Sequence, residues 1–154
     1  MAKQLDGAVG KAVRIVETVL KGLGLDPDKN RLPDLAGGAS WQISRGSAEV
    51  MIGVNPGADG RAARIRLVSP LVKVQGELAP ALAVELLRLN ATELPGIAFG
   101  AFRDGVVALV AERSAAGLDR AELEDLLAAL GHYADKYDDV LVKQFGGTRV
   151  CDLG

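Results

Sequence analysis

The sequence has very few of the side chains that enzymes use as reagents or metal ligands. Its 154 residues include one histidine, His132, and one cysteine, Cys151, and only 4% are aromatic. No family motif surrounds either residue, so a catalytic Cys–His pair is disfavoured. A single cysteine cannot form an internal disulfide, which agrees with a reducing compartment. The scarcity of His, Cys and clustered acids argues against an enzyme.

The sequence also lacks a surplus of basic charge and a long apolar run. Eighteen basic and twenty acidic residues give a formal net charge of −2, so nucleic acid is not an expected partner. No apolar run approaches the roughly 20 residues that span a bilayer. Residues 1–11 contain Asp6 and two glycines where a signal peptide needs an apolar core. We therefore expect a cytoplasmic protein with no membrane partner.

No cofactor, metal or nucleotide motif is complete. Asp26, Asp28 and Asn30 take the first, third and fifth places of an EF-hand-like loop, but Arg31 stands where glycine is required. Gly60 precedes a predicted strand, whereas a phosphate-binding loop needs Gly-Lys-Ser/Thr at the start of a helix. The sequence therefore predicts no bound cofactor and no metal.

Two charged groups have both a structural and a functional interpretation. Asp135, Asp138 and Asp139 have helical spacing and could share a cation, but neither His nor Cys joins them. A solvated acidic face is the favoured interpretation. Arg64 and Arg66 share one face of a predicted strand, where they form either a solvated surface or a site for an anion or an acidic peptide.

The periodicity of the apolar residues predicts elements in the order α-β-β-β-α-β-β-α. Helical spacing predicts helices over residues 4–22 and 80–91 and a long helix that begins at the acid-capped Leu118-Asp119. Alternation predicts strands near residues 40–44, 49–54, 63–67, 97–102 and 106–112. Asp104-Gly105 is a strong hairpin signal. We expect an α+β fold in a single domain, residues 1–154, with 146–154 as a flexible tail.

The predicted helix over residues 80–91 is apolar in more than one direction. Leu86 and Leu89 belong to one stripe, whereas other apolar residues point well away from it. Either one subunit buries the helix completely, or a second copy of the chain covers part of it. We predict a homodimer whose interface contains Leu82, Val84, Leu87 and Ala91.

The first predicted helix has an apolar face that is wider than a narrow seam. This face either packs only in the core or also receives a partner segment. Met51 lies on the strand face opposite Val50 and Ile52, and its flexible thioether adapts to varied partners. We predict that a client binds a surface formed by Val9, Val13, Ile15, Val16, Leu20, Trp41 and Met51.

Several short motifs point to a known family. They are Leu86-Leu87-Arg88-Leu89-Asn90, Phe99-Gly100, Asp104-Gly105-Val106-Val107, Leu118-Asp119 and Tyr137-Asp138-Asp139. With them, the C-terminal half resembles the YbjN-like family of small bacterial proteins, which is grouped with type III secretion chaperones. The predicted element order is similar to that of the whole secretion-chaperone-like fold. The resemblance implies a five-stranded antiparallel sheet backed by helices, often in a dimer, that holds a client segment without catalysis.

These observations lead to two hypotheses about function. We expect a non-catalytic, chaperone-like protein-binding module that holds a segment of a client protein or peptide in the cytoplasm. The alternative is a small-ligand-sensing regulatory module. An open apolar groove or an exposed strand edge favours the first, and an enclosed pocket with convergent polar groups favours the second.

Overall fold

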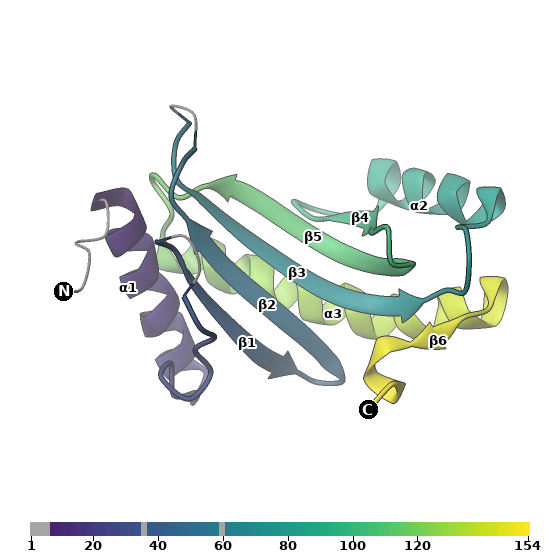
Figure 1. Cartoon of the computed structure of the whole chain (residues 1–154), viewed down its shortest axis with the longest axis horizontal. Coiled ribbons are helices and arrows are strands. Elements are labelled where there is room, and N and C mark those ends of the chain that lie inside the picture. The colour runs from purple at the N-terminus through teal and green to yellow at the C-terminus, as the bar shows by residue number, and fades with distance from the viewer. Residues whose placement is uncertain (1–6, 35–36, 59–60) are drawn as a thin grey trace. The chain divides into compact units, whose positions relative to one another are not determined.

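The computed structural model describes residues 7–34, 37–58 and 61–154. Its elements follow the expected order, with one short strand added after the last helix (Figure 1). The predicted start of the first helix, residues 4–6, lies outside the described residues. The elements are α1 (Gly7–Gly22), β1 (Ala39–Arg45), β2 (Ala48–Asn55), β3 (Arg64–Lys73), α2 (Pro80–Thr92), β4 (Ala98–Ala101), β5 (Val106–Ser114), α3 (Arg120–Phe145), β6 (Thr148–Arg149) and the 3-10 helix η1 (Val150–Asp152).

The strands form a sheet with the order β1-β2-β3-β5-β4, and β6 pairs with the end of β3. Strands β4 and β5 are antiparallel, with Phe99 opposite Leu109. Strand β6 is also antiparallel to its neighbour, with Thr148 opposite Lys73. The expected α+β fold with an antiparallel sheet is confirmed. The sixth strand lies within residues 146–154, which the sequence predicts to be a tail.

The chain divides into two compact units, and each is built from three stretches of sequence. The first unit contains Met1–Ile43, Met51–Leu67 and Glu112–Leu127, and the second contains Ser44–Val50, Val68–Ala111 and Ala128–Gly154. Strands β1, β2, β3 and β5 and helix α3 each contribute residues to both units. The single-domain organisation therefore stays a prediction.

The core of the first unit forms between α1, the strands and the start of α3. Helix α1 lies beside β1 (Figure 1) and buries one face, because its apolar residues recur at helical spacing. The strands contribute alternate residues, as a half-buried sheet requires. The buried side chains include Val16 and Leu20 of α1, Trp41, Ile52 and Ile65 of the strands, and Leu123 and Leu127 of α3.

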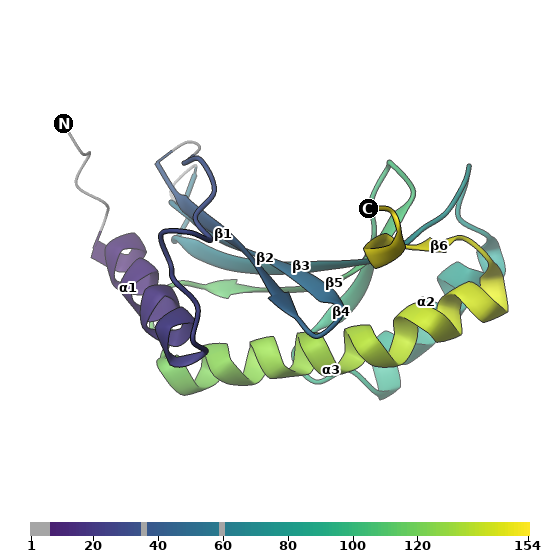
Figure 2. The same cartoon turned by 90° about the horizontal axis from the view of Figure 1, so that it is seen from below.

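In the second unit α2 packs against β4. Figure 2 shows the part of α3 that belongs to this unit lying along one face of the strands. The rings of Phe99 in β4 and Tyr137 in α3 meet edge to face, with their centroids 5.5 Å apart, which is a favourable geometry for two aromatic rings. Apolar side chains of α2, β5 and α3 are also buried in this unit, among them Leu82, Leu86, Leu109, Leu130 and Leu141.

The Asp104-Gly105 hairpin has the structure that the sequence predicts. The Gly105 N–H donates to the Phe102 carbonyl over 3.0 Å, and the Val106 N–H donates to the Asp104 carboxylate over 3.2 Å. Gly105 has a φ of 85°, which favours glycine. A Cβ at this position would lie 2.5 Å from the Val74 carbonyl oxygen, so the close backbone contact also excludes larger residues.

The acid at the start of α3 caps the helix as predicted. The Asp119 carboxylate accepts a hydrogen bond from the Glu122 backbone N–H over 2.8 Å, which satisfies one of the free donors of the first turn. The Glu122 side chain is paired instead with Arg113 at the end of β5. This pair and the cap hold the start of α3 within the first unit.

Candidate functional site

The carboxylates of the acidic group on α3 bind separate partners. Asp135 accepts a hydrogen bond from the Ser47 hydroxyl over 2.7 Å, and Asp139 lies 3.0 Å from the Arg149 guanidinium. Asp138 is buried and accepts the backbone N–H of Asp139. Burial raises the pKa of the Asp138 carboxyl above its ordinary value, although the Asp139 N–H opposes this effect. These carboxylates do not converge on a shared cation.

His132 and Cys151 have separate surroundings. The His132 side chain is exposed and its ring meets that of Tyr133 at a centroid distance of 4.9 Å, and the Cys151 thiol is also exposed. Within residues 7–34, 37–58 and 61–154, no three His, Cys, Asp or Glu side chains form a group that could hold a metal ion. Over the same described residues, the helices are too short or too polar to traverse a membrane.

Most of the predicted client-binding residues lie in the core of the first unit. The side chains of Val9, Val13, Val16, Leu20 and Trp41 are at most 6% exposed, because α1 turns its widest apolar face inward. The Arg31 guanidinium lies 4.9 Å from the centroid of the Trp41 ring. Ile15 is half-buried and Met51 is 39% exposed. A partner can therefore reach only these two residues of the predicted set without rearrangement, and client binding there stays a prediction.

Helix α2 is apolar in two directions, as its periodicity predicts, and it buries one stripe and leaves the other in solvent. Leu82, Leu86 and Leu89 are buried, whereas Leu87 is 68% exposed and Val84 is 43% exposed. Of the predicted interface residues, Leu82 is therefore part of the core, and Val84, Leu87 and Ala91 are accessible to a partner. A leucine that is two-thirds exposed gains little of the hydrophobic free energy that full burial of its side chain would provide. The homodimer stays a prediction.

The C-terminal end of α2 is tied to α3 by a polar cluster that the sequence did not reveal. The Glu93 carboxylate accepts hydrogen bonds from the Tyr137 hydroxyl and from Lys136, whose Nζ is 3.3 Å away. The Tyr133 hydroxyl donates to the Glu93 backbone carbonyl over 3.2 Å. The Tyr137 hydrogen bond, followed by that of Lys136, lowers the pKa of Glu93. This cluster keeps the exposed stripe of α2 in a defined orientation within the second unit.

Strand β4 ends the strand order of the sheet and is a candidate edge for strand addition. The Asn90 side chain of α2 already occupies part of this edge. Its Nδ2 donates to the Phe99 carbonyl over 3.2 Å, and its Oδ1 accepts the Phe99 N–H over 2.6 Å. Next to β4, Phe102 is 41% exposed. The edge is therefore partly closed by the chain itself.

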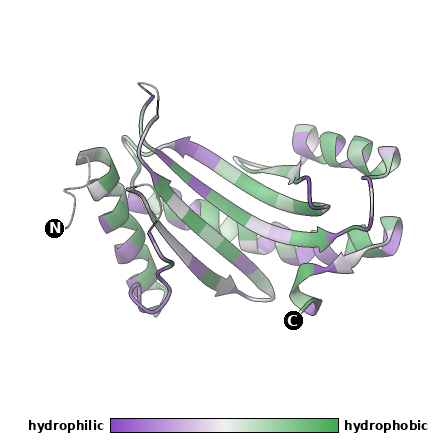
Figure 3. Ribbon diagram, in the orientation of Figure 1, coloured by the Kyte–Doolittle hydropathy of each residue, from purple (hydrophilic) through white to green (hydrophobic). Residues whose placement is uncertain are grey.

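A basic pocket of about 220 Å³ lies in the first unit, between the β2–β3 loop and the end of β5. The Arg64 Nε lies 2.6 Å from Glu112 Oε1, and the Arg66 Nη1 lies 2.7 Å from Glu112 Oε2. Arg61 also lines the pocket. In Figure 3 hydrophilic colour marks the start of β3 and the end of β5, which are neighbours in the sheet. The hydrogen bond from Arg64 lowers the pKa of Glu112, so this carboxylate stays ionised beside the arginines.

A second pocket, of about 340 Å³, lies in the second unit beside β6 and η1. It is lined by Ser47, Glu49, Pro70, Val150, Cys151 and Leu153, together with Gly154. Most of these residues are exposed, so the pocket is an open hollow. It is not the enclosed cavity with convergent polar groups that would favour a small-ligand sensor.

Comparisons with known proteins identify a family and a fold. The family model described as T3SS (YopN, CesT) and YbjN peptide-binding chaperone 1, TY-Chap1, matches residues 11–153. A comparison with curated proteins gives no match.

Solved structures with a similar fold cover most of this chain. A chain of the ExsC–ExsE complex is 23% identical, with 86% of this chain and 95% of that chain covered and a TM-score of 0.59. A chain of the ExoU–SpcU complex of the Pseudomonas aeruginosa type III secretion system is 20% identical, covering 80% and 95%, with a TM-score of 0.55. A chain of the complex of the Yersinia pestis chaperone SycH with a fragment of YscM2 is 16% identical. The match covers 81% of this chain and 98% of that chain, with a TM-score of 0.54.

Proposed function

The chain belongs to the TY-Chap1 family of peptide-binding chaperones, and we propose that it acts in the cytoplasm by holding a segment of a client protein without catalysing a reaction. The observation that carries this proposal is the family match over residues 11–153, which covers nearly the whole chain. Among the solved structures of similar fold, the Yersinia pestis structure is of a type III secretion chaperone, SycH, in complex with a fragment of another protein. The separated carboxylates of α3 and the exposed His132, which lies apart from Cys151, also agree with a role that needs no chemical reagent.

The accessible apolar side chains support two different contact surfaces. Met51 projects from the open face of β2 in the first unit, and Ile15 is half-buried on α1. We assign these two residues to client contact, because a methionine accommodates partners of different shape. The exposed residues of α2, Val84 and Leu87, are assigned to contact with a second copy of the chain. A self-complementary apolar helix face is a common basis for a two-fold dimer.

Affinity capture tests the proposal most directly. The tagged chain is incubated with native cytoplasm, and bound proteins are identified by mass spectrometry with Met51→Asp in parallel. We expect the wild-type chain to enrich one or a few proteins and Met51→Asp to lose them. Enrichment of the same proteins by both chains would place the client elsewhere. The absence of any enriched protein, together with a small molecule retained in the β6 pocket, would favour the alternative of a ligand sensor.

A further inference from the structure

The basic pocket of the first unit has more hydrogen-bond donors than Glu112, the acidic residue among its described lining residues, uses. A guanidinium group carries five N–H donors. Glu112 accepts one hydrogen bond from Arg64 and one from Arg66, and each of its two carboxylate oxygens accepts one of these bonds. Arg64 and Arg66 remain 46% and 43% exposed at their side chains. Both arginines line the pocket, and exposed guanidinium groups can form paired contacts with carboxylates.

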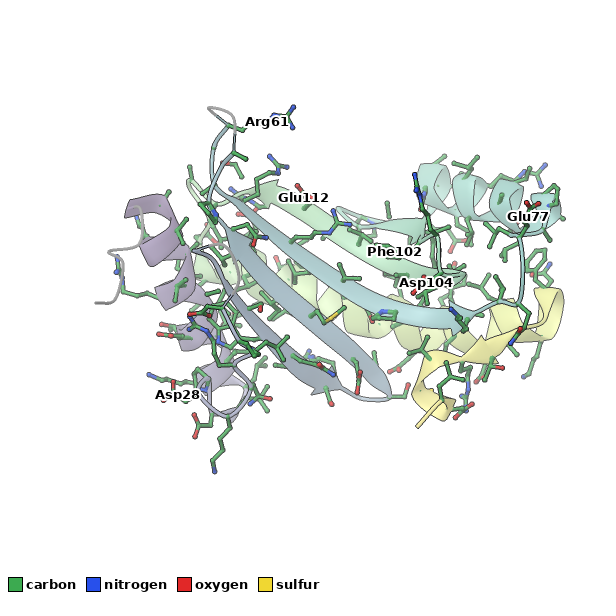
Figure 4. The ribbon with its side chains drawn as sticks, viewed as in Figure 1. Asp28, Arg61, Glu77, Phe102, Asp104 and Glu112 are labelled. Atoms are coloured by element: carbon green, nitrogen blue, oxygen red, sulfur yellow. The ribbon has the colours of Figure 1, made fainter. Side chains whose placement is uncertain are left out.

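Arg61 adds a third cation to the lining of the pocket. Figure 4 shows Arg61 on the β2–β3 loop and Glu112 at the end of β5. The described residues provide no ion-pair partner for the Arg61 guanidinium. Its backbone is placed by the loop, because the Arg61 N–H donates to the Ala58 carbonyl over 3.0 Å. A Cβ on Gly57 would overlap the Arg61 carbonyl, so this tight approach requires glycine.

The charges of the pocket favour a single small acidic group over a polyanion. Three guanidinium groups and one carboxylate among the described lining residues leave a local formal charge of +2. Glu112 stands between Arg64 and Arg66 and would repel a closely spaced row of phosphates. One additional carboxylate can instead accept hydrogen bonds from the arginine N–H groups that Glu112 does not use.

The surroundings of the pocket match an extended peptide. A Cβ on Gly53 of β2 would lie 3.9 Å from the Arg66 carbonyl oxygen, which places this part of β2 beside the arginines of β3. Met51, two residues away, projects on the same side of β2 as Gly53, since strand side chains alternate. An exposed apolar residue therefore lies close to the basic pocket on the open face of the sheet in the first unit.

From this arrangement we infer that Arg61, Arg64 and Arg66 bind an aspartate or glutamate side chain of the client segment, with an apolar residue of the same segment against Met51. The inference rests on the proposed function for the identity of its partner. Glu112 acts as an internal counter-ion that orients two of the arginines when the site is empty and weakens the attraction for the incoming carboxylate.

Two labelled peptides test the inference with the full chain in a fluorescence anisotropy titration. Both have the same sequence of alternating leucine and serine, with glutamate at two positions in one peptide and glutamine at these positions in the other. We expect the glutamate peptide to bind about three- to tenfold more tightly, with the difference decreasing as NaCl rises from about 0.05 M to about 0.5 M. Equal binding of the two peptides, or no binding of the glutamate peptide at about 1 mM, would overturn the inference.

Two substitutions should change this affinity in opposite directions. Arg61→Gln is expected to weaken binding of the glutamate peptide about three- to tenfold, whereas Glu112→Gln should strengthen it about threefold by removing the competing charge. Arg103→Gln is the matched control, because Arg103 is exposed and lies outside the pocket. Equal effects of the two arginine changes would contradict the inference. Weaker binding by Glu112→Gln with an unchanged thermal midpoint would contradict it as well.

Inorganic phosphate is the remaining probe. If phosphate binds more tightly than the glutamate peptide, the ligand of the pocket is a small anion and not a peptide carboxylate.

The result of the peptide titration can be distinguished from the result of client capture. If a client is captured and the two peptides bind equally, the inference fails alone. If the glutamate peptide binds as expected and no client is captured, the proposed function fails and the pocket stands as a carboxylate site.

Discussion

Asn90 and Phe99 share a pair of hydrogen bonds that imitates the pairing of two strands. The side-chain amide of Asn90, on α2, donates to the carbonyl of Phe99 and accepts its N–H, over 3.2 and 2.6 Å. A neighbouring strand would satisfy the same two backbone groups. Because β4 is the last strand in the sheet order, this side chain protects a position that would otherwise present unpaired groups to another chain.

Replacing Asn90 with alanine should open this edge. We expect Asn90→Ala to lower the free energy of unfolding by about 1–2 kcal/mol, because Phe99 loses two partners for its partly buried backbone groups. Chemical denaturation measures the loss, and hydrogen exchange at the Phe99 amide should become faster. Thr92→Ala is the control, since the Thr92 hydroxyl donates to the Arg88 carbonyl of its own helix, over 2.8 Å. Unchanged protection of the Phe99 amide would refute the role of Asn90.

The exposed stripe of α2 gives a test of the dimer. Light scattering of the wild-type chain at tens of micromolar should give twice the chain mass, and Leu87→Glu should reduce it to one chain mass because a buried charge opposes an apolar interface. Leu153→Glu makes the same change at a leucine that is 56% exposed on the segment after η1, and it should leave the dimer intact. A monomeric wild-type chain at this concentration would rule out the interface.

Client contact by Ile15 and Met51 should be separable from folding. Met51→Asp is expected to abolish client capture and to change the thermal midpoint by less than about 2 °C, because an exposed side chain contributes little to stability. Ile15→Asp should also abolish capture, with a larger loss of stability because Ile15 is half-buried. Val140→Asp, at a valine that is 45% exposed on α3, serves as the control. Capture that survives both client-site changes would move the client to another surface.

Replacing either of two neighbouring aspartates of α3 with asparagine should change stability near pH 7 in opposite directions. The pKa of Asp138 is raised by burial above the ordinary value of 3.8. Folding therefore disfavours its ionised form above the folded pKa, and this cost disappears as the pH falls below the ordinary value. Asp138→Asn should raise the free energy of unfolding near pH 7, with a gain that vanishes near pH 3.

Asp139 provides the matched comparison. Its carboxylate is 56% exposed and pairs with Arg149 over 3.0 Å, so Asp139→Asn should lower stability slightly near pH 7, by about 0.2–1 kcal/mol. Thermal or urea unfolding of both variants at the two pH values measures the difference. If Asp138→Asn raises the free energy of unfolding equally at both pH values, the stability cost does not come from a buried, ionised Asp138.

Local signals in the sequence were sufficient for most of the elements. The Asp104-Gly105 pair, the acid cap at Asp119 and the two stripes of α2 are all found as predicted, because each depends on residues that are near neighbours in the chain. Strand β6 and the C-terminal part of β3 were not predicted. Pro70 interrupts the strand signal of β3, and a strand of two residues, Thr148–Arg149, is too short for alternation to be visible.

The sequence by itself determined the order of the elements from α1 to α3, the wide apolar face of α1 and the fact that Val84 and Leu87 point away from the Leu86 stripe of α2. Only the tertiary structure decided that the face of α1 is core, with Trp41 fully buried, and that the accessible residues are Met51 and the α2 stripe. It also brought Arg64 and Arg66 to Glu112, 46–48 residues away. The reason is that periodicity specifies which side chains share a face, whereas burial and ion pairing depend on which distant segment covers that face.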